Sequence, residues 1–132
     1  MKVIIAGSRT INSYIVVQDA IEKSGFDDMC CPWMGTDDCT CEGKVNGITE
    51  VVSGCARGVD ALGEEWAYMN HRQLKLFPAD WSNGPSAGHQ RNARMAGYAD
   101  ALIAVWDGAS KGTANMIAEA KKRGLKVFVY EV

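Results

Sequence analysis

The sequence has no excess of charge of one sign and no long hydrophobic run. Its 132 residues contain 14 lysines and arginines against 16 aspartates and glutamates, for a formal net charge of −2. Proteins that hold nucleic acid through its phosphates usually present a broad basic face, so this balance argues against a nucleic-acid partner. No apolar stretch approaches the length of a membrane span, and the apolar run at residues 1–6 is too short for a signal peptide. We therefore expect a soluble, cytoplasmic protein with no membrane partner.

The chain also lacks the length for two hydrophobic cores, so we expect a single domain over residues 1–132. Short apolar runs typical of strands alternate in it with segments of helical spacing. The strands are expected at residues 3–6, 48–52, 74–77, 101–105 and 126–130. The helices are expected after Asn12 or Ser13, with Ile15, Val16, Ala20 and Ile21 facing the core, and at residues 57–70, 85–97 and 113–123. Near-continuous apolar strands that alternate with helices are typical of a covered parallel sheet. The sequence therefore predicts an α/β fold, a single Rossmann-like domain with about five parallel strands and helices on both faces.

Three polar segments with glycine follow predicted strands directly. We call them the first glycine loop (residues 7–10, Gly-Ser-Arg-Thr), the second glycine loop (residues 53–58, Ser-Gly-Cys-Ala-Arg-Gly) and the third glycine loop (residues 107–113, Asp-Gly-Ala-Ser-Lys-Gly-Thr). A strand that ends at glycine before a helix leaves backbone N–H groups at the positive end of the helix dipole, where phosphate is stabilised. The carboxyl ends of parallel strands lie at one edge of the sheet, so the three loops can form one cleft. They predict a nucleotide-like ligand, although the dinucleotide fingerprint G-x-G-x-x-G is absent.

The predicted ligand-binding residues come from these loops and from the helices beside them. They are Gly7, Ser8, Arg9, Ser53, Gly54, Ala56, Arg57, Gly58, Asp60, Arg91, Asn92, Asp107, Gly108, Ser110, Lys111, Gly112 and Thr113. Asp60 either accepts hydrogen bonds from ribose hydroxyls or only stabilises the start of its helix. Arg91 either reaches the cleft or is solvated. Thr113 is expected to cap the helix that follows the third glycine loop, and either Trp81 or Trp106 can offer a platform for a base.

Four of the five cysteines crowd into an inserted loop at about residues 27–47, namely Cys30, Cys31, Cys39 and Cys41. Without an export signal, thiols or metal ligands are expected there rather than disulfides. Four thiolates could bind one structural zinc, but the spacing C-C-x7-C-x-C lacks paired C-x-x-C units. Free thiols and a zinc site therefore both remain open, and no other cofactor is required.

Taken together, the motifs resemble the SLOG superfamily, specifically its YspA-type branch of small stand-alone proteins, which is related to cpYpsA. The resemblance lies in residues 7–11, 51–63, 77–81, 87–92 and 106–113, and only residues 27–47 fall clearly outside it. It implies a Rossmann-like fold that binds nucleotides or nucleotide-derived signals. It also implies glycine-rich turns on the phosphates and Arg91 near the ribose or phosphate.

More distant similarity connects the chain to enzymes and to DNA-binding proteins. Lonely Guy phosphoribohydrolases cleave the base from nucleoside monophosphates with a glutamate three residues after the threonine of their G-T motif. Met116 occupies that position here. DprA-like relatives bind single-stranded DNA, but this chain lacks an aromatic and basic stripe.

Three functional hypotheses therefore stand. The first is a protein that senses or sequesters a nucleotide-like ligand. The second is an N-glycosidic-bond hydrolase or transferase that uses Asp60 or Glu64, with Arg91, in place of the missing glutamate. The third is a protein-interaction domain that uses the inserted loop. Helix faces rich in alanine and methionine are also compatible with a homodimer.

Overall fold

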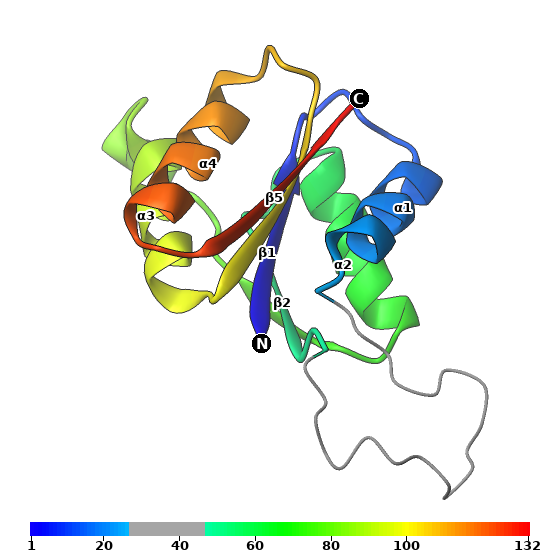
Figure 1. Cartoon of the computed structure of the whole chain (residues 1–132). Coiled ribbons are helices and arrows are strands. Elements are labelled where there is room, and N and C mark those ends of the chain that lie inside the picture. Colours follow the sequence, from blue (N-terminus) through cyan, green and yellow to red (C-terminus); the bar gives the residue numbers. More distant parts are fainter. Residues whose placement is uncertain (27–46) are drawn as a thin grey trace, which may run out of the picture.

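A parallel sheet forms the centre of the domain, as the sequence predicts. The computed structural model describes residues 1–26 and 47–132. Within them, five strands lie in the order β3-β2-β1-β4-β5, all parallel (Figure 1). The strands are β1 (Lys2–Gly7), β2 (Glu50–Ser53), β3 (Gln73–Leu76), β4 (Ala101–Trp106) and β5 (Lys126–Glu131). Since β1 pairs with both β2 and β4, the first glycine loop leaves the middle of the sheet.

Two helices cover each face of the sheet. α1 (Tyr14–Ser24) and α2 (Val59–Met69) lie on one face, while α3 (Ala87–Tyr98) and α4 (Lys111–Lys122) lie on the other (Figure 1). A short 3-10 turn, η1 (Trp81–Asn83), precedes α3. Alternate residues of β1 serve the two layers, since Ile5 packs under α1 and α2 and Ile4 packs under α3 and α4. Burial on both faces explains the continuous apolar runs of β1, β2 and β4, whereas every residue of the edge strand β3 is exposed.

The inward face of α1 differs from the prediction. Ile15 is 74% exposed and Val16 only half-buried, whereas Val17, Ala20 and Ile21 are buried. The buried positions follow the spacing i, i+3, i+4 of a helix face. Ile15 lies about 200° around the helix from Val17, so the expectation that Ile15 faces the core was wrong.

Gly58 marks a close approach between the first and second glycine loops. Its φ is +73°, and a Cβ there would lie 2.5 Å from the carbonyl oxygen of Ser8 and 2.7 Å from that of Arg9. Both obstacles are backbone atoms, which cannot turn aside as a flexible side chain could. A residue with a side chain is therefore excluded by conformation and by contact together.

We predict that Gly58→Ala lowers the free energy of unfolding by about 2 kcal/mol or more. Gly97→Ala in α3 is the matched control, because its Cβ would meet only the end of the Arg123 side chain at 3.4 Å. The control should be neutral or stabilising by up to about 1 kcal/mol. Urea denaturation of both variants measures the difference, and equal stability of the two would contradict the close approach.

Candidate functional site

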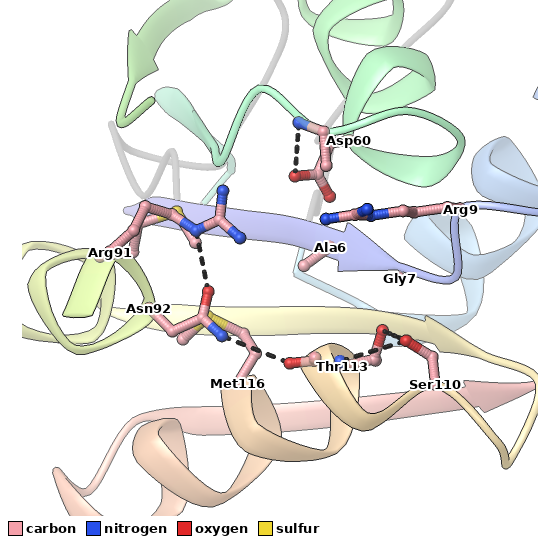
Figure 2. Close-up of a pocket in the computed structure, with 12 residues that line it drawn as sticks. Ala6, Gly7, Arg9, Asp60, Arg91, Asn92, Ser110, Thr113 and Met116 are labelled. Atoms are coloured by element: carbon pink, nitrogen blue, oxygen red, sulfur yellow. Dashed lines mark hydrogen bonds between the residues drawn. The ribbon is translucent and has the colours of Figure 1, made fainter. Parts of the chain in front are cut away.

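A recess of about 60 Å³ lies at the carboxyl edge of the sheet, where the three glycine loops meet. Its polar walls are Arg9 from the first loop, Asp60 from α2, Arg91 and Asn92 from α3, and Thr113 from α4 (Figure 2). The remaining lining residues are Ala6, Gly7, Ala56, Met95, Ser110, Gly112 and Met116. The recess has room for a group of phosphate size, whereas sites for whole small molecules are several times larger.

A wider groove of about 630 Å³ adjoins the recess. The two share the side chains of Arg9, Ala56 and Arg91, so they form one continuous cleft. The second glycine loop and the segment that follows β3 both line the groove. The further lining residues are Gly54, Cys55, Arg57, Pro78, Ala79 and Trp81.

Arg91 is held at the junction of recess and groove. Its side chain is only 9% exposed. Nη1 donates a hydrogen bond of 2.5 Å to the carbonyl oxygen of Gly54, and Nε donates one of 3.0 Å to Oδ1 of Asn92. Among the described residues none accepts a hydrogen bond from Nη2, which is therefore available to a ligand. The expectation that Arg91 can reach the cleft is met, and its solvated alternative is wrong.

Asn92 extends this network to the third glycine loop. Its Nδ2 donates to the carbonyl oxygen of Gly112 at 3.3 Å (Figure 2), and it also donates to Oδ1 of Asn115 at 3.0 Å. Through Arg91 and Asn92, α3 thus joins the second loop to the third. The network fixes the two sides of the recess relative to each other.

Asp60 is the buried acid of the recess. It is 4% exposed, and its Oδ2 accepts a hydrogen bond of 3.2 Å from the backbone N–H of Ala56. Burial raises the pKa of Asp60 from its usual 3.8 to about 6, against the lowering effect of that hydrogen bond and of the charges on Arg91 and Arg9. Within the described part of the chain no ion pair forms at Asp60. A carboxyl that titrates near neutral pH in a cleft marks a candidate functional group.

The side chains of two residues expected to bind ligand form hydrogen bonds that shape the loops. Oγ of Ser8 accepts a hydrogen bond of 3.1 Å from the backbone N–H of Asp107. Oδ1 of Asp107 accepts hydrogen bonds from the backbone N–H groups of Ala109 and Ser110 at 2.8 and 3.0 Å, and these bonds lower the pKa of Asp107. Neither side chain lines the recess or the groove. The first and third loops are thus joined by side chains that bind backbone.

The second glycine loop is built in a similar way. Oγ of Ser53 donates to Oε2 of Glu64 at 3.0 Å and accepts from the backbone N–H of Cys55 at 3.1 Å. This pairing lets the loop turn at Cys55, whose φ is +63°. Glu64 does not line the cleft, so the structure favours Asp60 over Glu64 as its acid. Gly58, Gly108 and Lys111 also lie outside both linings.

The residue that caps the start of α4 differs from the one predicted. The N-cap is Ser110, whose Oγ accepts hydrogen bonds from the backbone N–H of Thr113 at 3.4 Å and from its Oγ1 at 3.1 Å. The helix begins at Lys111, so the expectation that Thr113 is the cap was wrong. Thr113 is buried instead and lines the recess. The backbone N–H groups of Lys111 and Gly112 lie in the first turn of α4, where they have no hydrogen-bond partner within the helix. They belong to the positive end of the helix dipole.

Sequence reasoning missed one wall of the cleft. Pro78 and Ala79 line the groove and lie just beyond the end of β3, after Phe77. The rule that ligands bind at the carboxyl ends of parallel strands applies to β3 as well and could have identified them. Met116 also lines the recess, so a thioether stands at this point of the wall and not a carboxylate.

The proposed zinc ligands Cys30, Cys31, Cys39 and Cys41 lie outside the described residues. In residues 1–26 and 47–132, no three His, Cys, Asp or Glu side chains gather as a metal site would require. Helices in the same ranges are all too short or too polar to cross a lipid bilayer.

Comparison with known proteins gives one informative match. The Gene 61 protein of Mycobacterium phage D29 is 40% identical over 84 residues, which cover 58% of this chain and 67% of the phage protein. The chain belongs to the family of that phage protein. No protein-family model and no solved structure matches the chain. Membership of the phage protein's family leaves the function to be argued from the cleft.

We predict that Asp60→Asn stabilises the protein at neutral pH. Native Asp60 binds its proton more tightly than the unfolded chain does, so the free energy of unfolding falls as the pH rises from about 4 to about 6. The variant has no such titration. Its free energy of unfolding should therefore exceed that of the wild type by up to about 3 kcal/mol at pH 7, but by little at pH 4. Urea denaturation at both pH values measures the effect.

Glu65→Gln is the control, because Glu65 is an exposed carboxylate on the same helix. It should change stability little at either pH. A less stable Asp60→Asn variant at pH 7 would instead mean that ionised Asp60 holds Arg91 in place.

Proposed function

We propose that the cleft binds a nucleotide or a nucleotide-derived ligand, which the protein senses or sequesters. One observation carries the proposal. The three glycine loops and α3 converge on a single recess that holds two arginine side chains and the start of a helix. These are the donors that a phosphate group uses in proteins.

The recess suits the phosphate. Arg9 and Arg91 point into the same space from opposite sides (Figure 2). The N-terminal turn of α4 adds its dipole at Gly112 and Thr113. The one carboxyl in the lining is Asp60, which can take up a proton when an anion approaches, because its pKa is already raised to about 6.

The groove suits the nucleoside. It is about ten times larger than the recess, and the side chains of Arg9 and Arg91 line both. A ligand with its phosphate in the recess would therefore extend its sugar and base into the groove. The resemblance of the loop motifs to the SLOG superfamily supports the same assignment.

Sensing or sequestration is favoured over hydrolysis by Met116. Cleavage of an N-glycosidic bond develops positive charge at the sugar, which a carboxylate stabilises. Met116 is 1% exposed in the wall of the recess, and its neutral thioether carries no negative charge that could stabilise the sugar.

Asp60 supports a second candidate function, that of an N-glycosidic-bond hydrolase or transferase. A buried carboxyl with a pKa of about 6 beside an arginine is suited to general acid–base chemistry. Incubation with nucleoside monophosphates, followed by chromatography of the free base, tests this function. Base release that Asp60→Asn abolishes and Glu65→Gln retains would support it, whereas intact nucleotide would leave binding as the function.

The first experiment is to denature the purified protein and to identify released small molecules by mass spectrometry. An intact nucleotide would support the proposal and identify the ligand. Free base together with sugar phosphate would support the hydrolase instead. A panel of nucleotides in a thermal-shift assay provides the equilibrium measurement on emptied protein.

We predict that Arg9→Ala weakens nucleotide binding by about tenfold or more without loss of stability. The Arg9 side chain is exposed and lines both recess and groove. Arg94→Ala is the matched control, since Arg94 is exposed on α3 outside both linings. Titration calorimetry compares the two, and equal affinities would contradict the placement of phosphate in the recess.

A further inference from the structure

Trp81 is a large aromatic side chain that the fold leaves uncovered. It is 57% exposed and lines the groove, in the turn between β3 and α3. Burial of an indole normally contributes substantially to stability, so an exposed one in a groove calls for an explanation.

The backbone around Trp81 is fixed by its own hydrogen bonds. Asp80 caps η1, and its Oδ1 accepts from the backbone N–H of Ser82 at 3.1 Å and from Oγ of Ser82 at 2.5 Å. The N–H of Gly84 donates to the carbonyl oxygen of Trp81 at 3.1 Å. The ring is thus presented from a constrained turn, which lowers the entropy that a ligand contact would cost.

At Gly88 the Trp81 ring lies close to Arg91, the side chain that is expected to bind phosphate. A Cβ at Gly88 would lie 3.4 Å from Cη2 of Trp81 and 4.0 Å from Nη2 of Arg91. The indole edge and the guanidinium therefore both lie within 4.0 Å of the same point beside α3. Nη2 is also the nitrogen of Arg91 that no described residue binds. A ligand held there has the aromatic ring as its neighbour.

The other described tryptophans do not offer such a surface. Trp66 is 4% exposed in the core between α1, α2 and the sheet. Trp106 packs against the core under α3 and α4, and its Nε1 donates to the carbonyl oxygen of Ser110 at 3.1 Å. Of the two platforms that the sequence leaves open, the structure brings Trp81 to the cleft.

We propose that Trp81 is the stacking platform for the base of the ligand, so that the cleft selects phosphorylated nucleosides over phosphorylated sugars. The inference rests on the proposed nucleotide function and narrows it. Every base has a π face that an indole can stack on, and purines offer the larger one. The exposed side chain of Arg57 lines the same groove as the ring.

The test compares adenosine 5′-monophosphate with ribose 5-phosphate, which lacks the base. Titration calorimetry on the wild type should show at least tenfold tighter binding of the nucleotide. Trp81→Ala should remove most of that ratio and leave the affinity for ribose 5-phosphate unchanged. Trp81→Phe should retain much of it. Tyr68→Ala is the matched control, because Tyr68 is 81% exposed at the end of α2 and lies outside the cleft.

A second measurement does not depend on the alanine variant. Adenosine 5′-monophosphate should quench the fluorescence of the wild type, and this quenching should be largely lost in Trp81→Phe. Ribose 5-phosphate should quench little in either protein.

The outcomes separate this inference from the proposed function. If Trp81→Ala keeps the preference for the nucleotide, stacking on Trp81 is wrong while nucleotide binding stands. If the wild type binds both compounds equally, the base is not recognised and the inference also fails. If neither compound nor any nucleotide binds, the proposed function fails together with the inference.

Discussion

The cleft depends on the burial of one cation, the guanidinium of Arg91. Removal of such a group from water costs several kcal/mol unless hydrogen bonds replace its hydration. Here the partners are the carbonyl oxygen of Gly54 and the amide of Asn92, both neutral. Burial lowers the pKa of Arg91, and the nearby charge of Asp60 opposes that effect without forming an ion pair. The positive charge is therefore held in place but is not fully compensated, which is the condition for attracting an anion.

The pattern of the sequence was sufficient for the fold and for the position of the cleft. Continuous apolar strands that alternate with helices specify a parallel sheet, and the glycine loops then necessarily lie at one edge of it. The burial of Arg91 could not be read from its place on a helix, because helical arginines are usually solvated. It follows from the contact of α3 with the second loop, a contact between residues 37 positions apart.

The details inside the loops were less accessible for a different physical reason. Short polar side chains that can bind a ligand can equally bind nearby backbone. The side chains of Ser8, Ser53 and Asp107 each accept a hydrogen bond from a backbone N–H group. The cap at Ser110 rather than Thr113 arises in the same way, since either hydroxyl could have served. Sequence marks such residues as important without deciding between the two uses.

The strand order has a consequence for folding. The chain builds outward from β1 through β2 to β3 and then crosses to β4 on the other side of β1. Arg9 and Asp60 belong to the part built first, whereas Arg91, Asn92 and Thr113 belong to the part that follows the crossing. The recess is complete only when both halves have docked. A ligand bound there contacts both halves at once, and so it would suppress local opening at their junction and couple the unfolding of one half to that of the other.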